Sequence, residues 1–79
     1  MYQEIFEKIA KIISDITGIE CDKVFPQADF LRDLNIDPSE KAEILRRAFA
    51  DFQVEPKDEE KEDIVTVQQL VELIHDKLS

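Results

Sequence analysis

Two apolar stripes with a helical period constrain the fold more than any other feature of this sequence. Near the start of the chain, apolar residues recur at spacings of one, three and four: Ile5, Phe6, Ile9, Ile13 and Ile16. Near its end they recur at i, i+3, i+4, i+7 and i+11: Val67, Leu70, Val71, Ile74 and Leu78. In the first of these segments, charged residues fill the other face: Glu4, Glu7, Lys8, Lys11 and Asp15. Both stripes therefore predict amphipathic helices, one over residues 3–17 and one from residue 67 onward.

A third helix is predicted from the signal at its start. Asp37 can accept hydrogen bonds from first-turn amides as the N-cap, Pro38 suits the first helical position, and Glu40 completes a capping box. We expect this helix to run to about Phe52 and to bury a set of small and large apolar residues: Ala42, Ile44 or Leu45, Ala48, Phe49 and Phe52.

The other boundaries are also marked locally. Gly18 is the only glycine and stands where the first helix would end, since it offers the left-handed residue of a C-cap. Thr66 and Gln69 stand three residues apart, which predicts a capped start for the last helix.

The predicted helices leave two segments between them. Residues 19–36 lack a helical period, and we expect the apolar residues of this long first loop to anchor it onto the helices: Val24, Phe25, Phe30, Leu31 and Leu34. Residues 53–65 are rich in acids, and we expect one short helical turn there after Pro56. The sequence thus predicts an all-α protein, a small bundle of three to four helices with a long first loop.

Length and charge exclude several classes of protein. The 79 residues allow one domain over 1–79, and nineteen acids against ten bases give a net charge of −9. This charge disfavours nucleic-acid binding and loose self-association, so we expect a monomer with protein partners. No apolar run could span a membrane.

The residues that carry chemistry are few. Cys21 is the only cysteine and His75 the only histidine, and no metal-binding spacing is present, so we expect neither a metal site nor catalytic residues. The protein is therefore not expected to be an enzyme, and a reducing cytoplasm is its expected location. We expect Cys21 at the edge of the core, and His75 in the last turn of its helix, where a cation complements the helix dipole.

The middle of the chain resembles the acyl carrier protein family. The stretch Phe30-Leu31-Arg32-Asp33-Leu34-Asn35-Ile36-Asp37 is similar to the family's F-x-x-D-L-G-x-D, which leads into the second helix. Glu43, Phe52 and Val54 fall where the family has its Glu and Phe-x-Ile, and residues 64–67 resemble its I-T-T-V. The resemblance implies a carrier of acyl intermediates on a 4′-phosphopantetheine arm, in fatty-acid, lipid or polyketide-type synthesis.

The chain departs from the family at the residue that bears the arm. The family has Asp-Ser-Leu, whereas this chain has Asp37-Pro38-Ser39, and proline has no hydroxyl to attack coenzyme A. Ser39 stands one residue further along the helix, about 1.5 Å higher and rotated by about 100°. Ser39 is thus either a displaced attachment site beside a helix N-terminus or an ordinary polar residue of a first turn.

The same resemblance implies a partner-binding face on the second helix, formed by Asp37, Glu40, Glu43, Arg46 and Arg47. Acyl-transferring and biosynthetic enzymes would be the partners. The bases bring residues 37–53 close to neutral, so the partner surface should be less basic than is usual for the family, or mixed in sign. Ala42 and Ala48 would leave room for an acyl chain between the helices.

Two hypotheses about function follow. In the first, the chain is a carrier with its arm on Ser39. In the alternative, the same bundle is an unmodified paralogue that acts as a docking or regulatory module, with Pro38 as a block.

Overall fold

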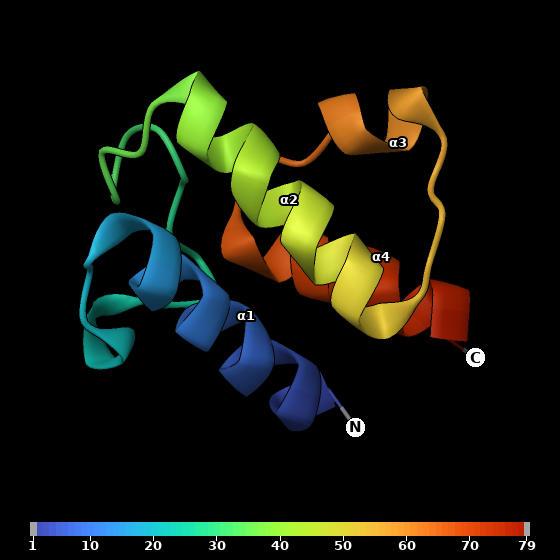
Figure 1. The fold of residues 1–79 in the computed structure, drawn as a ribbon, viewed down its shortest axis with the longest axis horizontal. Coiled ribbons are helices and arrows are strands. Elements are labelled where there is room, and N and C mark those ends of the chain that lie inside the picture. The colour runs from blue at the N-terminus through green and yellow to red at the C-terminus, as the bar shows by residue number, and fades with distance from the viewer. Residues whose placement is uncertain (1, 79) are drawn as a thin grey trace.

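The computed structural model describes residues 2–78, so the first and last residues of the predicted domain lie outside the described range. Its helices are α1 (Tyr2–Thr17), η1, a short 3-10 helix (Cys21–Lys23), α2 (Pro38–Phe52), α3 (Asp58–Glu62) and α4 (Val67–Leu78) (Figure 1). Within residues 2–78 there is no β-strand, and an isolated antiparallel bridge joins Asp29 to Thr66. The predicted all-α class and the long first loop are confirmed.

The predicted helix boundaries are confirmed together with the contacts that cause them. Gly18 follows α1 with φ 82, and its N–H donates to the carbonyl oxygen of Ser14 at 2.8 Å. Glycine adopts this left-handed conformation at little cost because it has no Cβ, which suits it to end a helix.

The starts of α2 and α4 are both held by side-chain caps. At α2, Asp37 Oδ1 accepts from the Glu40 N–H at 2.8 Å, and Glu40 Oε1 accepts from the Asp37 N–H at 3.4 Å. At α4, Thr66 Oγ1 accepts from the Gln69 N–H at 3.2 Å, and Gln69 Oε1 accepts from the Thr66 N–H at 2.9 Å. Each cap satisfies amides that the helix itself leaves unpaired.

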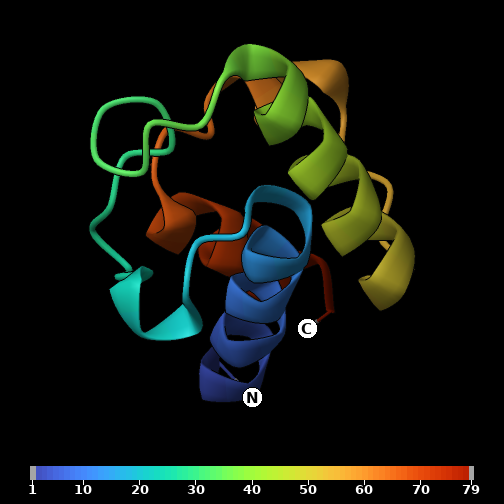
Figure 2. The same cartoon turned by 60° about the vertical axis from the view of Figure 1, so that its left-hand side comes forward.

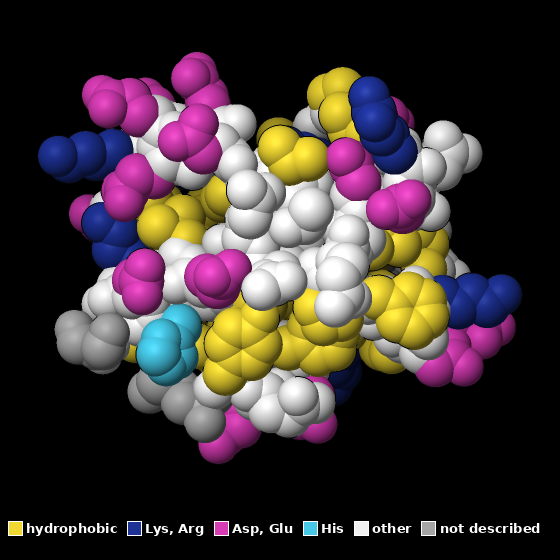
Figure 3. Space-filling model, turned by 180° about the vertical axis from the view of Figure 1, so that it is seen from behind, with side chains coloured by type: hydrophobic (Ala, Val, Ile, Leu, Met, Phe, Trp, Pro, Cys, Tyr) yellow, Lys and Arg dark blue, Asp and Glu magenta, His cyan; other side chains and the backbone are white. Residues whose placement is uncertain are grey.

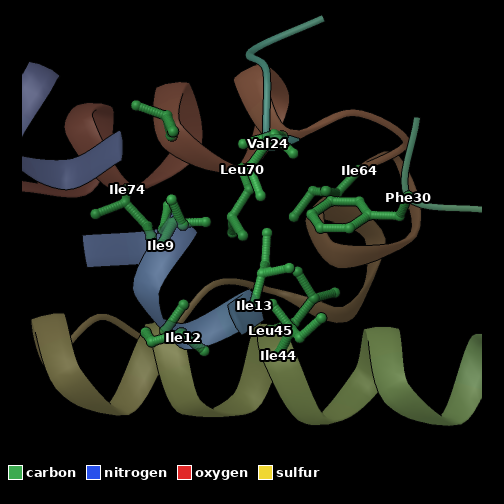
Figure 4. Close-up of a cluster of buried hydrophobic side chains, with 14 of the residues drawn as sticks. Ile9, Ile12, Ile13, Val24, Phe30, Ile44, Leu45, Ile64, Leu70 and Ile74 are labelled. Carbon is green, nitrogen blue, oxygen red and sulfur yellow. The ribbon is translucent and has the colours of Figure 1, made fainter. Parts of the chain in front are cut away.

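The core forms where α1 packs against both α2 and α4 (Figures 1 and 2). In Figure 4, Ile12 and Ile13 of α1 lie against the side of α2 that carries Ile44 and Leu45, and Leu70 of α4 points toward Ile13. Of these side chains, Ile13, Ile44 and Leu70 are fully buried. The apolar stripes of the sequence therefore meet in one shared core.

The long first loop is fastened to the start of α4. Three backbone hydrogen bonds join the two: Phe30 N to Val65 O at 3.0 Å, Val67 N to Ala28 O at 3.1 Å, and Gln68 N to Pro26 O at 2.8 Å. Val24 and Phe30 are buried, and Leu34 packs partly against the core, so these predicted anchors are confirmed.

Two predicted anchors are wrong, because Phe25 is 59% exposed and Leu31 is 46% exposed. The turn that contains Leu31 explains its exposure. Asp29 Oδ1 accepts from the N–H groups of Leu31 and Arg32 at 2.8 and 3.0 Å, and this tight turn directs Leu31 outward while Phe30 points inward.

Three further side chains are less buried than the sequence predicted. Ala42 is exposed because it faces a surface groove beside α3 and not the core. Leu78 is 39% exposed, since it lies beyond His75, whose ring is already beside Tyr2 at the start of α1. Cys21 is exposed on η1, with Sγ 3.7 Å from the carbonyl oxygen of Ala10, so its predicted place at the core edge is wrong.

Candidate functional site

Ser39 lies exposed in the first turn of α2, directly after Asp37 and Pro38. Its hydroxyl makes no hydrogen bond to any of the described residues 2–78. In this first turn, Pro38 has no N–H and the N–H of Glu40 is bound by Asp37. The amide of Ser39 is thus the first-turn donor that remains to face an anion held on the Ser39 oxygen.

Pro38 occupies the first helical position of α2 and is also exposed. Its ring is compatible with the helix start, because the N–H that it lacks would have no partner there. Pro38 therefore stabilises the start of α2 and offers no nucleophile at the position where the family has its serine.

The exposed side of α2 carries an ion pair between Glu43 and Arg46. Arg46 Nη2 donates to the carboxylate of Glu43, one helical turn earlier. The hydrogen bond from Arg46 lowers the pKa of Glu43, and the same contact raises the pKa of Arg46. The pair removes one acid and one base from the charges that a partner could meet.

The other predicted partner-binding residues surround this pair. Asp37 and Glu40 hold each other in the capping box, so their carboxylates are partly committed to the fold. Arg47 is exposed and makes no ion pair with another described residue. The structure thus places the five predicted residues along α2 and its N-cap, with acids and bases interleaved. Asp37, Arg46 and Arg47 are exposed, and Glu40 and Glu43 are half-buried.

A groove of about 460 Å³ runs between α2 and the segment that leads into α3. Apolar side chains form most of its lining: Ala42, Leu45, Phe49, Val54 and Pro56. Arg46, Glu55 and Lys61 complete it and bring charge to its rim. Sequence reasoning placed Ala42 near such a space, but Ala48 is fully buried in the core and lies elsewhere.

The contribution of the α3 segment to this groove was missed from the sequence. Val54, Pro56 and Lys61 lie in the acid-rich stretch, for which the sequence predicted a loop with one short helical turn after Pro56 and no part in a groove. The sequence did contain a signal for this packing. Val54 and Pro56 are apolar residues, two apart in a polar segment, and such residues can pack against a neighbouring helix; both are buried.

Acidic side chains gather at the α3 end of the molecule, as the view from behind shows (Figure 3). Residues 55–63 hold six acids and two bases, although Lys61 lies 3.7 Å from Asp58 and Lys77 lies 3.1 Å from Glu60. Within residues 2–78, no group of three His, Cys, Asp or Glu side chains is arranged to hold a metal ion. None of the described helices is long and apolar enough to cross a membrane.

The fold and the site together define a small helical bundle that presents a hydroxyl at the start of α2, beside an apolar groove. No family model matches the chain. An acyl carrier protein from Thermosynechococcus vestitus is 37% identical over 76 residues, which cover 96% of this chain and 94% of the relative. An acyl carrier protein from a Picosynechococcus species is 35% identical over 77 residues, 98% of this chain and 95% of the relative.

A solved structure gives the same result. The acyl carrier protein from Enterococcus faecalis superposes with a TM-score of 0.79 at 35% identity and covers 98% of each chain. This chain belongs to the acyl carrier protein family. The resemblance of its central motif to the family is confirmed, and so is the bundle that this resemblance implied.

Proposed function

We propose that this chain carries acyl groups on a 4′-phosphopantetheine arm attached to the Ser39 hydroxyl, for fatty-acid, lipid or polyketide-type synthesis. The observation that carries the proposal is the exposed, unbonded hydroxyl of Ser39 in the first turn of α2, within a chain of the acyl carrier protein family. The relatives support an acyl-carrier role and do not favour the alternative of a module that carries nothing.

The surroundings of Ser39 suit a phosphodiester. Attachment would form a bond from Ser39 Oγ to the phosphorus of the arm, release the nucleotide half of coenzyme A, and pass the hydroxyl proton to a base of the transferring enzyme. The resulting anion would lie beside the free Ser39 amide at the positive end of α2. Bound in this way, the arm would supply the thiol that holds the acyl group as a thioester.

The proposal extends to the partners and the setting of the protein. The chain would act as a single carrier domain and as a monomer, with no catalytic residue of its own, and its partners would be acyl-transferring and biosynthetic enzymes. The net charge of −9 supports a monomer that does not bind nucleic acid. The single cysteine supports a cytoplasmic location.

The docking face would be formed by Asp37, the N-cap of α2, and by four residues of the helix: Glu40, Glu43, Arg46 and Arg47. Because the Glu43–Arg46 pair and Arg47 bring this face close to neutral, an enzyme that docks there should present both signs of charge.

Intact mass spectrometry tests the attachment. The chain is incubated with coenzyme A and a broad-specificity phosphopantetheinyl transferase, beside a Ser39→Ala variant as the matched control. We expect a mass gain of one phosphopantetheine that is absent from the control. No gain in the wild-type chain, together with a gain in Pro38→Ser, would refute the proposal and show that the bundle has lost its attachment site.

A further inference from the structure

The first loop presents two large apolar side chains on its surface. Phe25 is 59% exposed and Leu31 is 46% exposed, whereas Val24 and Phe30 of the same loop are buried. Phe25 is also part of a groove of about 440 Å³, together with two further apolar residues, Ala28 and Leu34, and three polar ones: Lys23, Gln27 and Asp33. The exposed Phe25 ring therefore belongs to a recess with an apolar part, and such surfaces often mark contacts with other proteins.

The turn that carries Leu31 borders the same groove. The N–H groups of Asp33 and Leu34 donate to the carbonyl oxygen of Asp29 at 3.0 and 3.1 Å, so residues 29–34 form one compact turn. Leu34 of this turn lines the groove beside Phe25, and Leu31 projects from the turn into solvent. Phe25 and Leu31 thus belong to one continuous part of the surface.

This part of the surface lies next to the first turn of α2 (Figures 1 and 2). The N–H of Ile36 donates to the Phe30 carbonyl oxygen at 2.9 Å, and Lys41 Nζ of α2 lies 6.0 Å from the centre of the Phe30 ring. From Ile36 to Ser39 the chain can extend by only about 11 Å. A specific interface covers about 800 Å² of each partner, a disc of about 16 Å radius, so an enzyme centred on Ser39 reaches the turn that carries Leu31.

Charge offers little attraction on this side of the molecule. Residues 24–53 hold six acids and four bases, so they carry −2 of the net charge of −9. Several of these groups are engaged within the chain: Asp29 Oδ1 accepts from the Leu31 N–H at 2.8 Å, Asp33 Oδ2 accepts from the Asp29 N–H at 2.8 Å, and Glu43 pairs with Arg46. An enzyme that docks here therefore gains little affinity from opposite charge, and burial of apolar area has to supply more of it.

We propose that the enzyme that attaches the arm to Ser39 docks on the first loop as well as on α2, and that it presents an apolar surface to Phe25 and Leu31. This inference rests on the proposed attachment at Ser39 and names the contact that the enzyme needs. Both side chains lie away from the reacting hydroxyl. They therefore contribute to binding before and during the reaction alike, which affects KM and leaves kcat unchanged.

Serine substitutions at the two positions test the contact. Phe25→Ser and Leu31→Ser are compared with the wild type and with Leu78→Ser, a control at a side chain that is 39% exposed. Leu78 ends α4, on the far side of the molecule from the first loop in Figure 1. The measurements are kcat and KM for attachment by the broad-specificity phosphopantetheinyl transferase, and the Kd of each chain for that enzyme by isothermal titration calorimetry. Circular dichroism checks that each variant folds.

We expect KM and Kd to rise about tenfold in Phe25→Ser and in Leu31→Ser, with kcat unchanged, because each variant removes a buried apolar contact from the complex. Leu78→Ser should match the wild type. An unchanged KM and Kd in either loop variant would overturn the inference, and so would an equal rise in Leu78→Ser.

The response to salt is a second test on the wild type alone. The screening length is about 8 Å at about 0.15 M salt, so charges elsewhere in the chain already act weakly there. Between about 0.15 and 0.5 M sodium chloride, kcat/KM should fall by less than about threefold, because apolar contacts are not screened. A larger fall would overturn the inference, since docking would then depend on charge.

Failure of this inference can be distinguished from failure of the proposed function. A wild-type chain that gains the arm, with loop variants that behave like it, refutes the docking contact alone. A wild-type chain that binds the enzyme but gains no arm refutes attachment at Ser39, and the Kd values of the loop variants still measure the contact. A wild-type chain that neither binds nor gains the arm refutes both.

Discussion

The backbone N–H of Phe30 donates to the carbonyl oxygen of Val65 at 3.0 Å, and the Phe30 ring is fully buried beside Ile64 (Figure 4). This contact joins the long first loop to the segment before α4. It also fixes Asp37 and the start of α2, because only six residues lie between Phe30 and Asp37 and the N–H of Ile36 donates back to the Phe30 carbonyl oxygen at 2.9 Å.

Replacing Phe30 by alanine should remove a large part of the stability of the fold. A fully buried phenylalanine costs about 3–5 kcal/mol when it is truncated, out of a total of about 5–15 kcal/mol for a domain. Urea denaturation followed by circular dichroism gives the free energy of unfolding. Phe25→Ala is the matched control, since Phe25 is exposed and should change this free energy by less than about 0.5 kcal/mol. Equal losses in the two variants would contradict the placement of the loop.

Removal of the α2 cap should have a smaller effect. Asp37→Ala deletes the acceptor of the Glu40 N–H and should lower the free energy of unfolding by about 1 kcal/mol. Asp37→Asn keeps an acceptor oxygen at the same place and should recover most of that loss. Chemical denaturation of the three proteins measures both effects. An alanine variant as stable as the wild type would show that the cap does not hold this helix.

Added salt should stabilise the protein. The net charge of −9 makes the folded chain repel itself, and this repulsion weakens as the screening length falls to about 10 Å at about 0.1 M salt. The melting temperature should therefore rise from low to moderate sodium chloride. The double variant Glu59→Lys and Glu62→Lys brings the net charge closer to zero and should show a flatter response. A wild-type melting temperature that does not change with sodium chloride concentration would count against this explanation.

The stability contributed by Asp29 should depend on pH. Hydrogen bonds from the backbone N–H groups of Arg32 and Leu31 lower the pKa of Asp29 below its ordinary value of 3.8. A group with a lowered pKa in the folded state stabilises the fold above its unfolded pKa, and this contribution disappears as the pH falls through the folded pKa. The melting-temperature difference between wild type and Asp29→Asn should thus be largest near neutral pH and shrink in acid. A melting-temperature difference that grows in acid would contradict a lowered pKa of Asp29.

The helix ends could be predicted because their causes are local in sequence. Gly18, the Asp37–Glu40 box and the Thr66–Gln69 box act over three or four residues, so the sequence alone contains them. Which side chains of the loop are buried could not be predicted in the same way. Phe25 and Phe30 are the same residue type in the same segment, yet only Phe30 is buried. Its burial accompanies contacts with Val65 and Ile64, far away in the chain.

The candidate site, like the fold, could be predicted only where its causes are local in sequence. The position of Ser39, one residue beyond the family's serine, follows from the sequence, and so does the near-neutral charge of α2. The groove could not be predicted, since it requires the segment around Val54 and Pro56 to pack beside Ala42 and Phe49. That packing depends on tertiary structure, which no local pattern in the acid-rich segment describes.

The fastening of the first loop to α4 also determines how the chain can reach its folded state. Helices α1, α2 and α4 can each begin to form from local contacts, but the bonds from Ala28 and Phe30 to Val67 and Val65 join points separated by nearly half the chain. Closing so large a loop costs conformational entropy before the contacts that it brings together can stabilise the fold. Folding rates also fall as contacts become less local. Closure of this loop onto α4 is therefore a non-local step on which completion of the core must wait, and it sets this small helical protein apart from bundles whose helices pair only with their neighbours in sequence.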